Sequence, residues 1–384
     1  MKKYKLGDIC EIVSGSTPKT NITEFWDGDV KWITPAELDE NTYIITDSVR
    51  KITNLAMQKT GLTAFPAGTV ILSSRAPIGK VAIAGCKMCC NQGFKNFICS
   101  EIVNNKYLYW FLKHNTAYLN SLGRGATFKE ISKSIVSSIE IDLPSLEEQK
   151  RVVDNIEKIS TIITLRKKEI SILDDLIKAR FVEMFGLVRN NVYGYKIKML
   201  QDVCEPIKDG THQTPTYVND AQHGFKFLSS KDVTSGKINW SKIKYIPSDL
   251  HEELYAKIKP KRGDILLAKN GTTGVAAVVE TDEIFDIYVS LALLRPIDMN
   301  SIYLWAAVNS ADTKHQFDSS LKGIGVPNLH LGDIKKTKII VPPLELQSQF
   351  ADFVIQVDKS KATVQKALDE TQFLFDSLMQ KYFG

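Results

Sequence analysis

The chain has 384 residues, of which 43% are hydrophobic and 24% are charged, and its formal net charge at pH 7 is +5. This composition is that of a globular protein with enough apolar residues for two hydrophobic cores. The small basic excess is compatible with a nucleic-acid partner but does not require one. No apolar run reaches the length of a membrane span, and Asp8 and Glu11 exclude a secretory signal behind the basic start. We therefore expect a cytoplasmic protein with no membrane partner.

Residues 1–143 are predicted to form a first globular domain of mixed helix and strand. Short β-rich segments lie between glycine or proline residues, at 30–33, 69–72 and 81–84. A short helix is expected over 106–119, and alternation of apolar and polar residues predicts a last strand over 135–143. These short segments indicate an α+β domain.

Residues 144–186 are predicted to form one long helix. Ser145 with Glu148 has the spacing of an N-terminal capping box, and Gly186 follows the last residue of the pattern, where helices commonly stop. Such a helix is roughly 60 Å long, which exceeds the diameter of a small domain. Apolar residues form a stripe along it, which we assign to helix packing and subunit docking: Val152, Ile156, Ile159, Ile163, Ile170, Leu173 and Ile177.

The same plan is repeated in residues 187–341, a second domain, and 342–384, a second long helix. The segment Pro-Pro-Leu-Glu-Leu-Gln at 342–347 matches Pro-Ser-Leu-Glu-Glu-Gln at 144–149, about 200 residues earlier. A helix is expected over 301–317, as over 106–119 in the first half. The second helix carries a matching stripe of packing and docking residues: Phe353, Val357, Val364, Leu368 and Leu378. We conclude that the chain is an internal duplication.

No catalytic motif is present. The sequence contains no P-loop, dinucleotide-binding loop, nucleophile elbow, zinc-protease motif or amino-methyltransferase signature, and its six histidines form no pair at helical spacing. Cys86, Cys89, Cys90 and Cys99 have a spacing that resembles a zinc site. The second half has no cysteine in the equivalent region, so we interpret them as ordinary apolar residues of strands. We expect no catalytic residues and no metal site.

Two loops framed by matched glycines are candidates for binding DNA. The loop between Gly68 and Gly79 corresponds to the loop between Gly263 and Gly274, and Arg75 in the first aligns with Asn270 in the second. Arginine suits the O6 and N7 edge of guanine, whereas asparagine suits the N6 and N7 edge of adenine. A shared frame with different polar tips is what reading two different half-sites requires. Two unrelated surface turns explain this feature equally well.

Other polar segments recur in both halves. Glycine-rich turns with a cation lie at 123–127 and 322–325, and polar loops lie at 14–19 and 208–215; they are typical of phosphate contacts and also of solvated hairpins. The predicted DNA-contacting residues are Ser14, Thr17, Lys19, Ser74, Arg75, Lys80, Arg124, Lys208, Thr211, His212, Lys269, Asn270, Thr272, Lys322 and Asn328.

The order of these segments resembles a known family along essentially the whole chain. The first half has Leu-Gly-Asp-Ile at 6–9, Gly-Ser-Thr-Pro at 15–18 and Leu-Pro-Ser-Leu-Glu-Glu-Gln at 143–149. The second half has Asp-Gly-Thr-His-Gln-Thr-Pro at 209–215 and Gly-Asp-Ile-Leu-Leu at 263–267. This layout is similar to the specificity (S) subunit of Type I restriction–modification systems.

The resemblance implies an α+β fold in which two similar target-recognition domains are separated by two long antiparallel helices with pseudo-twofold symmetry. Each domain would read one half of a bipartite, asymmetric DNA site. The helices would dock two methyltransferase (M) subunits, which use S-adenosylmethionine, and restriction (R) subunits with ATP and Mg²⁺ would join through them. The alternatives are a stand-alone DNA-binding or regulatory protein and a coiled-coil adaptor that binds only protein.

Overall fold

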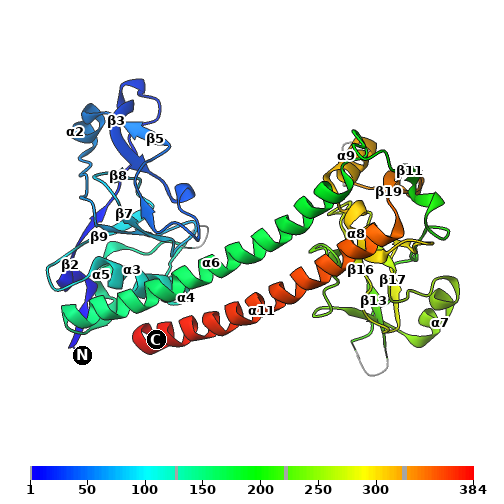
Figure 1. The fold of residues 1–384 in the computed structure, drawn as a ribbon. Coiled ribbons are helices and arrows are strands. Elements are labelled where there is room, and N and C mark those ends of the chain that lie inside the picture. Colours follow the sequence, from blue (N-terminus) through cyan, green and yellow to red (C-terminus); the bar gives the residue numbers. More distant parts are fainter. Residues whose placement is uncertain (1, 126–128, 220–223, 322–326) are drawn as a thin grey trace. The chain divides into compact units, whose positions relative to one another are not determined.

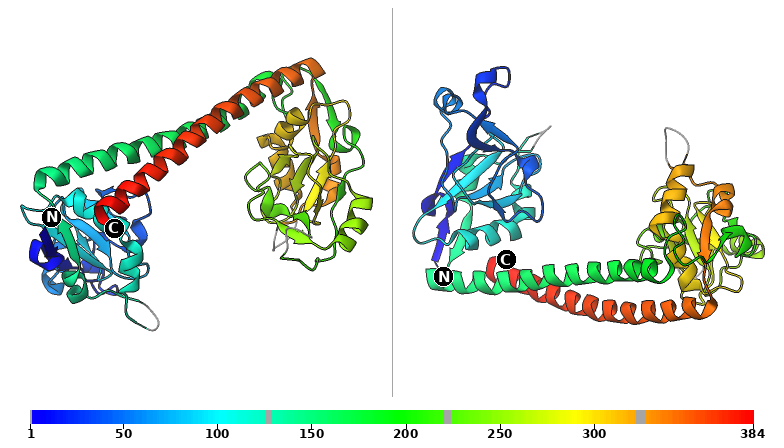
Figure 2. Two further views of the ribbon diagram at one scale, coloured as in Figure 1. Left: turned by 90° about the horizontal axis from the view of Figure 1, so that it is seen from below. Right: turned by 45° about the horizontal axis from the view of Figure 1, so that its top comes forward.

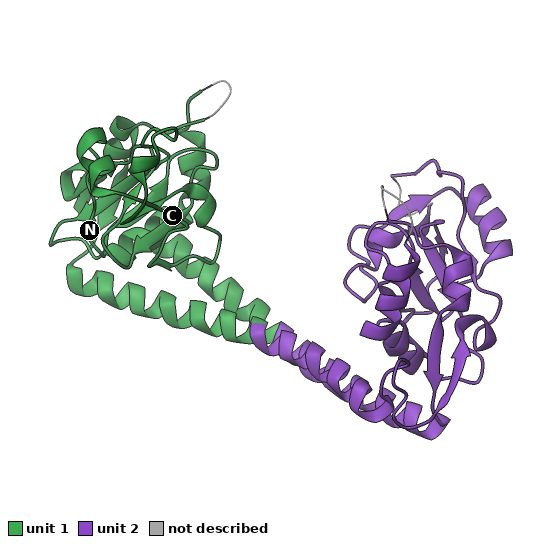
Figure 3. Cartoon of the chain, turned by 90° about the horizontal axis from the view of Figure 1, so that it is seen from above, with its two compact units in different colours: residues 1–167, 366–384 green, residues 168–365 purple. Residues whose placement is uncertain are grey.

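The computed structural model describes residues 2–125, 129–219, 224–321 and 327–384. The chain forms two compact units, residues 1–167 with 366–384, and residues 168–365 (Figure 3). Each unit contains one globular domain and one end of each long helix. Among the described residues, no helix is long and apolar enough to cross a membrane.

The two long helices, α6 (Leu146–Phe185) and α11 (Leu344–Phe383), have 40 residues each and run without interruption (Figures 1 and 2). The Glu148 N–H donates to Ser145 Oγ at 3.3 Å, and Gly186 has a φ of 71° immediately after α6. In the first unit, Ile156 near the start of α6 belongs to the same core as Phe383 at the end of α11. In the second unit, Phe181 near the end of α6 belongs to the same core as Phe350 near the start of α11. The two helices are therefore antiparallel, as predicted.

The first domain contains two sheets. The larger sheet has the strand order β2–β9–β6–β7–β4, and the smaller has the order β5–β3–β8. Strand β1 pairs with β10 in a separate ribbon. The strands are β1 (Lys2–Lys5), β2 (Cys10–Ser14), β3 (Trp26–Ile33), β4 (Ile44–Ile45), β5 (Arg50–Ile52), β6 (Val70–Ser73), β7 (Val81–Ala84), β8 (Cys89–Cys90), β9 (Phe94–Cys99) and β10 (Glu140–Leu143). The helices are α1 (Leu6–Ile9), α2 (Asn54–Thr60), α3 (Asn105–His114), α4 (Thr116–Ser121) and α5 (Lys133–Ser138).

The second domain repeats this arrangement. Its sheets have the orders β12–β18–β15–β16 and β14–β13–β17, and β11 pairs with β19. The strands are β11 (Lys196–Met199), β12 (Lys208–Asp209), β13 (Phe225–Leu228), β14 (Lys244–Ile246), β15 (Ile265–Ala268), β16 (Ala276–Val278), β17 (Phe285–Ile287), β18 (Leu291–Leu294) and β19 (Lys338–Val341). The helices are α7 (Ser248–Lys257), α8 (Ser301–Val308), α9 (Ala311–Ser320) and α10 (Leu331–Lys336). The internal duplication is thus confirmed, although β4 of the first domain has no counterpart among the described strands of the second.

A buried glutamine fastens each long helix to its domain. Gln149 accepts from the Asn104 N–H at 2.8 Å and donates to the carbonyls of Ile102 and Pro144 at 2.9 and 3.0 Å. Gln347 accepts from the Asn300 N–H at 3.0 Å and donates to the Pro342 carbonyl at 2.8 Å. The glutamine of the repeated Pro-x-Leu-Glu-x-Gln segment therefore satisfies backbone groups that burial would otherwise leave unpaired.

Three local predictions were wrong. The helix expected over 106–119 is split into α3 and α4, and the helix expected over 301–317 is split into α8 and α9. Each break follows an asparagine whose side chain turns back onto the preceding helix: Asn115 Nδ2 donates to the Phe111 carbonyl and Asn309 Nδ2 to the Trp305 carbonyl, both at 3.0 Å. The strand expected over 135–143 begins only at residue 140, since residues 133–138 form α5.

Candidate nucleic-acid interface

Loops that are far apart in the sequence meet beside the larger sheet of the first domain. The loop after β2 is joined to the end of β8 by the Ser16 N–H, which donates to the Cys90 carbonyl at 3.0 Å. The loop after β6 is joined on both sides: the Ser74 N–H donates to the Gly93 carbonyl at 2.7 Å, and the Ile131 N–H donates to the Ser74 carbonyl at 2.9 Å. Three predicted segments therefore share one edge, together with a fourth, residues 91–93, that sequence reasoning missed.

The fourth segment was missed because it has no glycine-framed repeat, but it is closely packed into this edge. A Cβ on Gly15 would lie 2.1 Å from the Asn91 carbonyl oxygen, so only glycine allows the approach. Thr17 Oγ1 donates a hydrogen bond to the side chain of Gln92. The exposed Gln92 is consequently a candidate contact beside Thr17. We call the group of segments 14–19, 74–80, 91–93 and 124–125 with 129–130 the first recognition edge; residues 126–127 of the predicted glycine-rich turn lie outside the described residues.

Charged groups of the first recognition edge are arranged in a chain. Lys95 is buried, and its Nζ lies 3.3 Å from both Ser74 Oγ and Glu130 Oε1. Arg75 Nη1 lies 4.0 Å from Glu130 Oε2, and the Arg75 side chain is 35% exposed. Ser74 is fully buried, so it supports the loop, while Arg75 is accessible. A buried cation needs a partner of opposite charge, and Glu130 is the carboxylate that pairs with Lys95. This ion pair fixes the position of Glu130.

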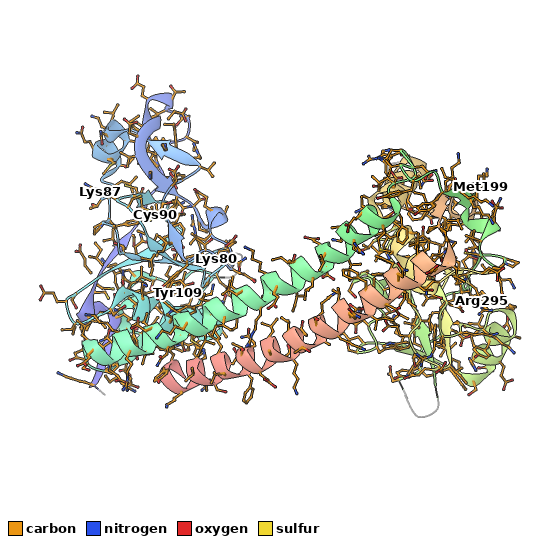
Figure 4. All side chains as sticks on the ribbon, viewed as in Figure 1. Lys80, Lys87, Cys90, Tyr109, Met199 and Arg295 are labelled. Carbon is orange, nitrogen blue, oxygen red and sulfur yellow. The ribbon has the colours of Figure 1, made fainter. Side chains whose placement is uncertain are left out.

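The other predicted contacts of the first domain differ in accessibility. Lys80, which Figure 4 labels, donates from Nζ to the carbonyls of Pro35 and Leu38 at 2.9 and 2.5 Å. Its ammonium thus joins the loop to the segment after β3. Ser14, Lys19 and Arg124 are exposed. The structure thus leaves Lys19, Arg75 and Arg124 as the accessible cations among the predicted residues of this edge.

Equivalent segments meet in the second domain. The Thr211 N–H donates to the Ile287 carbonyl at 3.2 Å, and the Lys269 N–H donates to the Ser290 carbonyl at 2.8 Å. Asn270 forms an isolated antiparallel bridge with Asn328. We call segments 208–215, 269–273, 288–290 and 327–329 the second recognition edge. Lys322, another predicted contact, lies outside the described residues.

The second recognition edge is built around a different ion pair. Lys269 is buried and forms an ion pair with Asp209, whose carboxylate also lies 3.6 Å from Nε2 of the exposed His212. Lys208 Nζ lies 3.4 Å from the Lys257 carbonyl oxygen, and the Lys208 side chain is exposed. Among the remaining predicted contacts, Thr272 and Asn328 are exposed and Thr211 and Asn270 are half-buried.

A hollow of about 470 Å³ lies beside this edge, and its wall includes Lys208, His212, Lys257 and Asp286. Asp286 Oδ2 is 2.6 Å from His251 Nδ1, and its Oδ1 has no hydrogen-bond partner among the described residues. Burial raises the pKa of Asp286, and the neighbouring His251 offsets part of that rise. The hollow therefore combines cationic side chains with one buried acceptor.

The four cysteines that resemble a zinc site are distributed over the first domain's two sheets and the loop before β8: Cys89 and Cys90 lie in β8, Cys99 in β9 and Cys86 in the loop. Burial raises the pKa of Cys89 to about 11 and the pKa of Cys90 to about 12, so both are thiols at neutral pH. Asn96 Nδ2 donates to Cys90 Sγ at 3.0 Å. Within the described parts of the chain, no three histidine, cysteine or carboxylate side chains are grouped as metal ligands would be.

Comparison with known proteins agrees with this architecture. Residues 1–173 and 194–371 match the family described as the Type I restriction modification DNA specificity domain. The Type I restriction enzyme MjaIX specificity subunit of Methanocaldococcus jannaschii is 30% identical over 98% of this chain and 91% of its own length. The MjaVIII specificity subunit of the same organism is 22% identical over 94% of this chain and 89% of its own length.

Solved structures show the same fold. A chain from a type I R-M system has a TM-score of 0.63 at 19% identity, covering 100% of this chain and 97% of that chain. The S subunit of M. genitalium has a TM-score of 0.57 at 15% identity, covering 100% of this chain and 96% of that chain. The duplicated domains, the paired helices and the two matched sequence regions lead to one conclusion: the chain belongs to the Type I restriction–modification DNA specificity family.

Proposed function

We propose that this chain is the non-catalytic DNA-recognition subunit of a Type I restriction–modification complex, and that each domain reads one half of a bipartite, asymmetric site. The observation that carries this proposal is the repeated recognition edge. In both domains, four separated segments meet beside the equivalent sheet, while the side chains at their tips differ, with Arg75 in one and Asn270 in the other. Equivalent backbone arrangements that present different side chains suit two different half-sites.

The helices supply a surface for partners that differs from the predicted stripe. Of the predicted docking residues, Val152, Ile156, Ile163, Ile177, Val357 and Leu368 are buried, and Ile159, Ile170, Leu173, Phe353, Val364 and Leu378 are half-buried. A second apolar row on α6 is exposed instead, with exposed fractions of 41%, 58%, 55% and 45% at Ile162, Leu165, Ile172 and Leu176. Their spacing places all four on one helix face, which is a surface that a partner helix would cover.

In this proposal, the exposed row of α6 contributes to docking methyltransferase subunits, and restriction subunits join through them. S-adenosylmethionine, ATP and Mg²⁺ are used by those partners, and this chain contributes the choice of DNA sequence. The complex methylates adenine within the recognised site. The predicted stripe then has the role of holding α6 and α11 together.

The recognition role is tested by expressing the chain with the methyltransferase subunit encoded beside it and mapping methylated adenines in host DNA by single-molecule sequencing. We expect one split, non-palindromic motif. Replacing residues 1–143 with the corresponding domain of a related subunit should change one half of the motif and leave the other unchanged. A motif that changes in both halves, or in neither, contradicts separate reading by the two domains.

The docking role is tested with Leu165→Glu and Ile172→Glu, which place charges on the exposed row. Both side chains are more than half exposed, so the fold should tolerate the changes, whereas co-purification of the methyltransferase subunit should be lost. Ser171→Glu is a matched control, because Ser171 is exposed on α6 outside the row. Retention of the partner by both row variants would exclude this surface; DNA binding without any partner would favour the stand-alone alternative.

A further inference from the structure

We infer that Glu130 positions Arg75 to read a guanine in the half-site of the first domain. The inference rests on the proposed function and extends it to a specificity-determining residue and a positioning residue. Neither the glycine frame nor the residue spacing identifies Glu130, because it lies about 50 residues after Arg75 in the chain. The structure brings the two residues together.

Arg75 is the cation of the first recognition edge that is both accessible and restrained. Its loop is anchored by the buried Ser73, whose Oγ donates to the Pro77 carbonyl at 2.7 Å and accepts from the Lys80 N–H at 2.9 Å. The side chain lies over Gly93, where a Cβ would be 3.5 Å from Arg75 Nε. The guanidinium thus lies between the loop after β6 and the missed segment 91–93.

Glu130 is fixed on two sides. Its backbone pairs reciprocally with Arg124, with the Arg124 N–H donating to the Glu130 carbonyl at 3.0 Å and the Glu130 N–H donating to the Arg124 carbonyl at 2.9 Å. Its Oε1 accepts from the buried Lys95, which leaves Oε2 facing Arg75. The carboxylate therefore has a defined position before any ligand arrives.

This geometry favours base reading over simple charge attraction. At 4.0 Å, the closest approach of Arg75 to Glu130 is an ion pair without a short hydrogen bond, so the guanidinium donors have no hydrogen-bond partner among the described residues. A guanidinium with two donors in one plane matches O6 and N7 of guanine. Confining the Arg75 side chain beside Glu130 and over Gly93 in advance lowers the conformational entropy lost on binding.

Among its described residues, the second recognition edge has no arginine paired with a carboxylate; its exposed His212 lies 3.6 Å from Asp209 instead. Asn270 occupies the position of Arg75, and its bridge partner Asn328 occupies the position of Glu130. The buried Lys269 is neutralised by Asp209 on the neighbouring strand β12. A neutral amide suits adenine, so we assign the guanine contact of this loop position to the first domain.

The experiment compares Arg75→Ala, Arg75→Lys and Glu130→Gln with the unchanged chain, each expressed with the methyltransferase subunit and read out as the methylated motif. For Arg75→Ala we expect roughly 10- to 100-fold relaxed discrimination at one G·C position of one half-site. Arg75→Lys should relax the same position, because lysine lacks the planar pair of donors. Glu130→Gln still accepts from Lys95, so the domain stays folded, and it should relax that position by a smaller factor.

Arg124→Ala is the control for a phosphate contact on the same edge. It should lower methylation at all sites together without changing the motif. The inference is overturned if Arg75→Ala leaves the motif unchanged, alters a position without guanine, or lowers methylation uniformly, or if Glu130→Gln acts only as Arg124→Ala does. Absence of a split motif with the unchanged chain would instead refute the proposed function itself.

Discussion

Each of the two recognition edges contains a buried lysine that is neutralised by a carboxylate, but the residues lie at different places in the two copies. In the first domain the buried lysine is Lys95 of β9, directly opposite Ser14 of β2. In the second domain the residue opposite Asp209 of β12 is Ala292, and the buried lysine is Lys269. A buried lysine therefore supports the edge in both copies. It lies in β9 in the first copy and directly after β15 in the second.

The carboxylate that pairs with the buried lysine also comes from a different place in each copy. As a result, the two edges differ in how far this carboxylate is exposed. The side chain of Glu130, the partner of Lys95, is 40% exposed and also faces Arg75. The side chain of Asp209, the partner of Lys269, is only 15% exposed. The first copy therefore exposes its carboxylate beside Arg75, whereas the second copy keeps a less exposed carboxylate, which still lies 3.6 Å from Nε2 of the exposed His212. Two copies of one frame can in this way present different chemistry.

The largest expected effect follows from removing one partner of the more buried pair. Asp209→Ala leaves Lys269 buried without a counter-charge, which should destabilise the second domain by about 3–5 kcal/mol. Glu130→Ala in the first domain should cost less, about 1–2 kcal/mol, because Glu130 is substantially solvated and Lys95 keeps the Ser74 hydroxyl. Hydrogen exchange of peptides from β15 and β6 reports the two domains separately.

The double variant Asp209→Ala with Lys269→Met is the control for this pair. Removing both charges should restore much of the protection lost in Asp209→Ala, since no unpaired charge is left. Equal losses of protection in Asp209→Ala and Glu130→Ala would show that the two ion pairs stabilise their domains equally. The distinction between the edges would then be wrong.

A second, smaller effect tests where the copies are alike. Gln149→Ala and Gln347→Ala each leave buried backbone groups at the start of a long helix without partners, so each should cost about 2–3 kcal/mol. Gln149 makes one more hydrogen bond than Gln347, so its loss should be the greater. Urea unfolding of the whole chain measures both, and Gln356→Ala, on the exposed surface of α11, should cost nothing measurable. A large loss in only one of the two would contradict equivalent anchoring.

The sequence predicted the architecture well, because the signals for it are repeated and long. The pattern of α6 and α11 extends over 40 residues each, and the matched segments at 144–149 and 342–347 carry the same buried glutamine. The split helices were missed because one asparagine does not by itself end an apolar helical pattern. Only the structure shows Asn115 turning back onto Phe111.

For the interface, the sequence identified the loops but not their neighbours. It aligned Arg75 with Asn270, yet it could not place Glu130 against Arg75 or residues 91–93 beside Thr17, because those contacts depend on tertiary packing. It also treated Ser74 and Lys269 as contacts, although both are buried supports. On the helices, the residues of the predicted apolar stripe are buried or half-buried, and the exposed row that includes Leu165 was not identified because it has fewer members.

The smallest expected effect concerns one backbone position in the loops after β6 and β15. Ala76 has a φ of 41° and the aligned Gly271 has a φ of 75°, so both are left-handed. A Cβ at Gly271 meets no atom within 4 Å, so Gly271→Ala tests backbone strain alone and should cost about 1 kcal/mol. Ala76→Gly should gain less than that, because glycine also makes the unfolded chain more flexible.

Urea unfolding measures the change in unfolding free energy for Gly271→Ala and for Ala76→Gly, and the signs of these two changes are compared. Opposite signs would show that the first copy tolerates strain at a loop position that the second copy relieves with glycine. Such strain persists where the surrounding structure holds it, and in the first domain the neighbouring residue is Arg75, which Glu130 restrains. If Gly271→Ala costs nothing, the left-handed position is unstrained in this loop, and the presence of alanine in the first copy has no bearing on how Arg75 is presented.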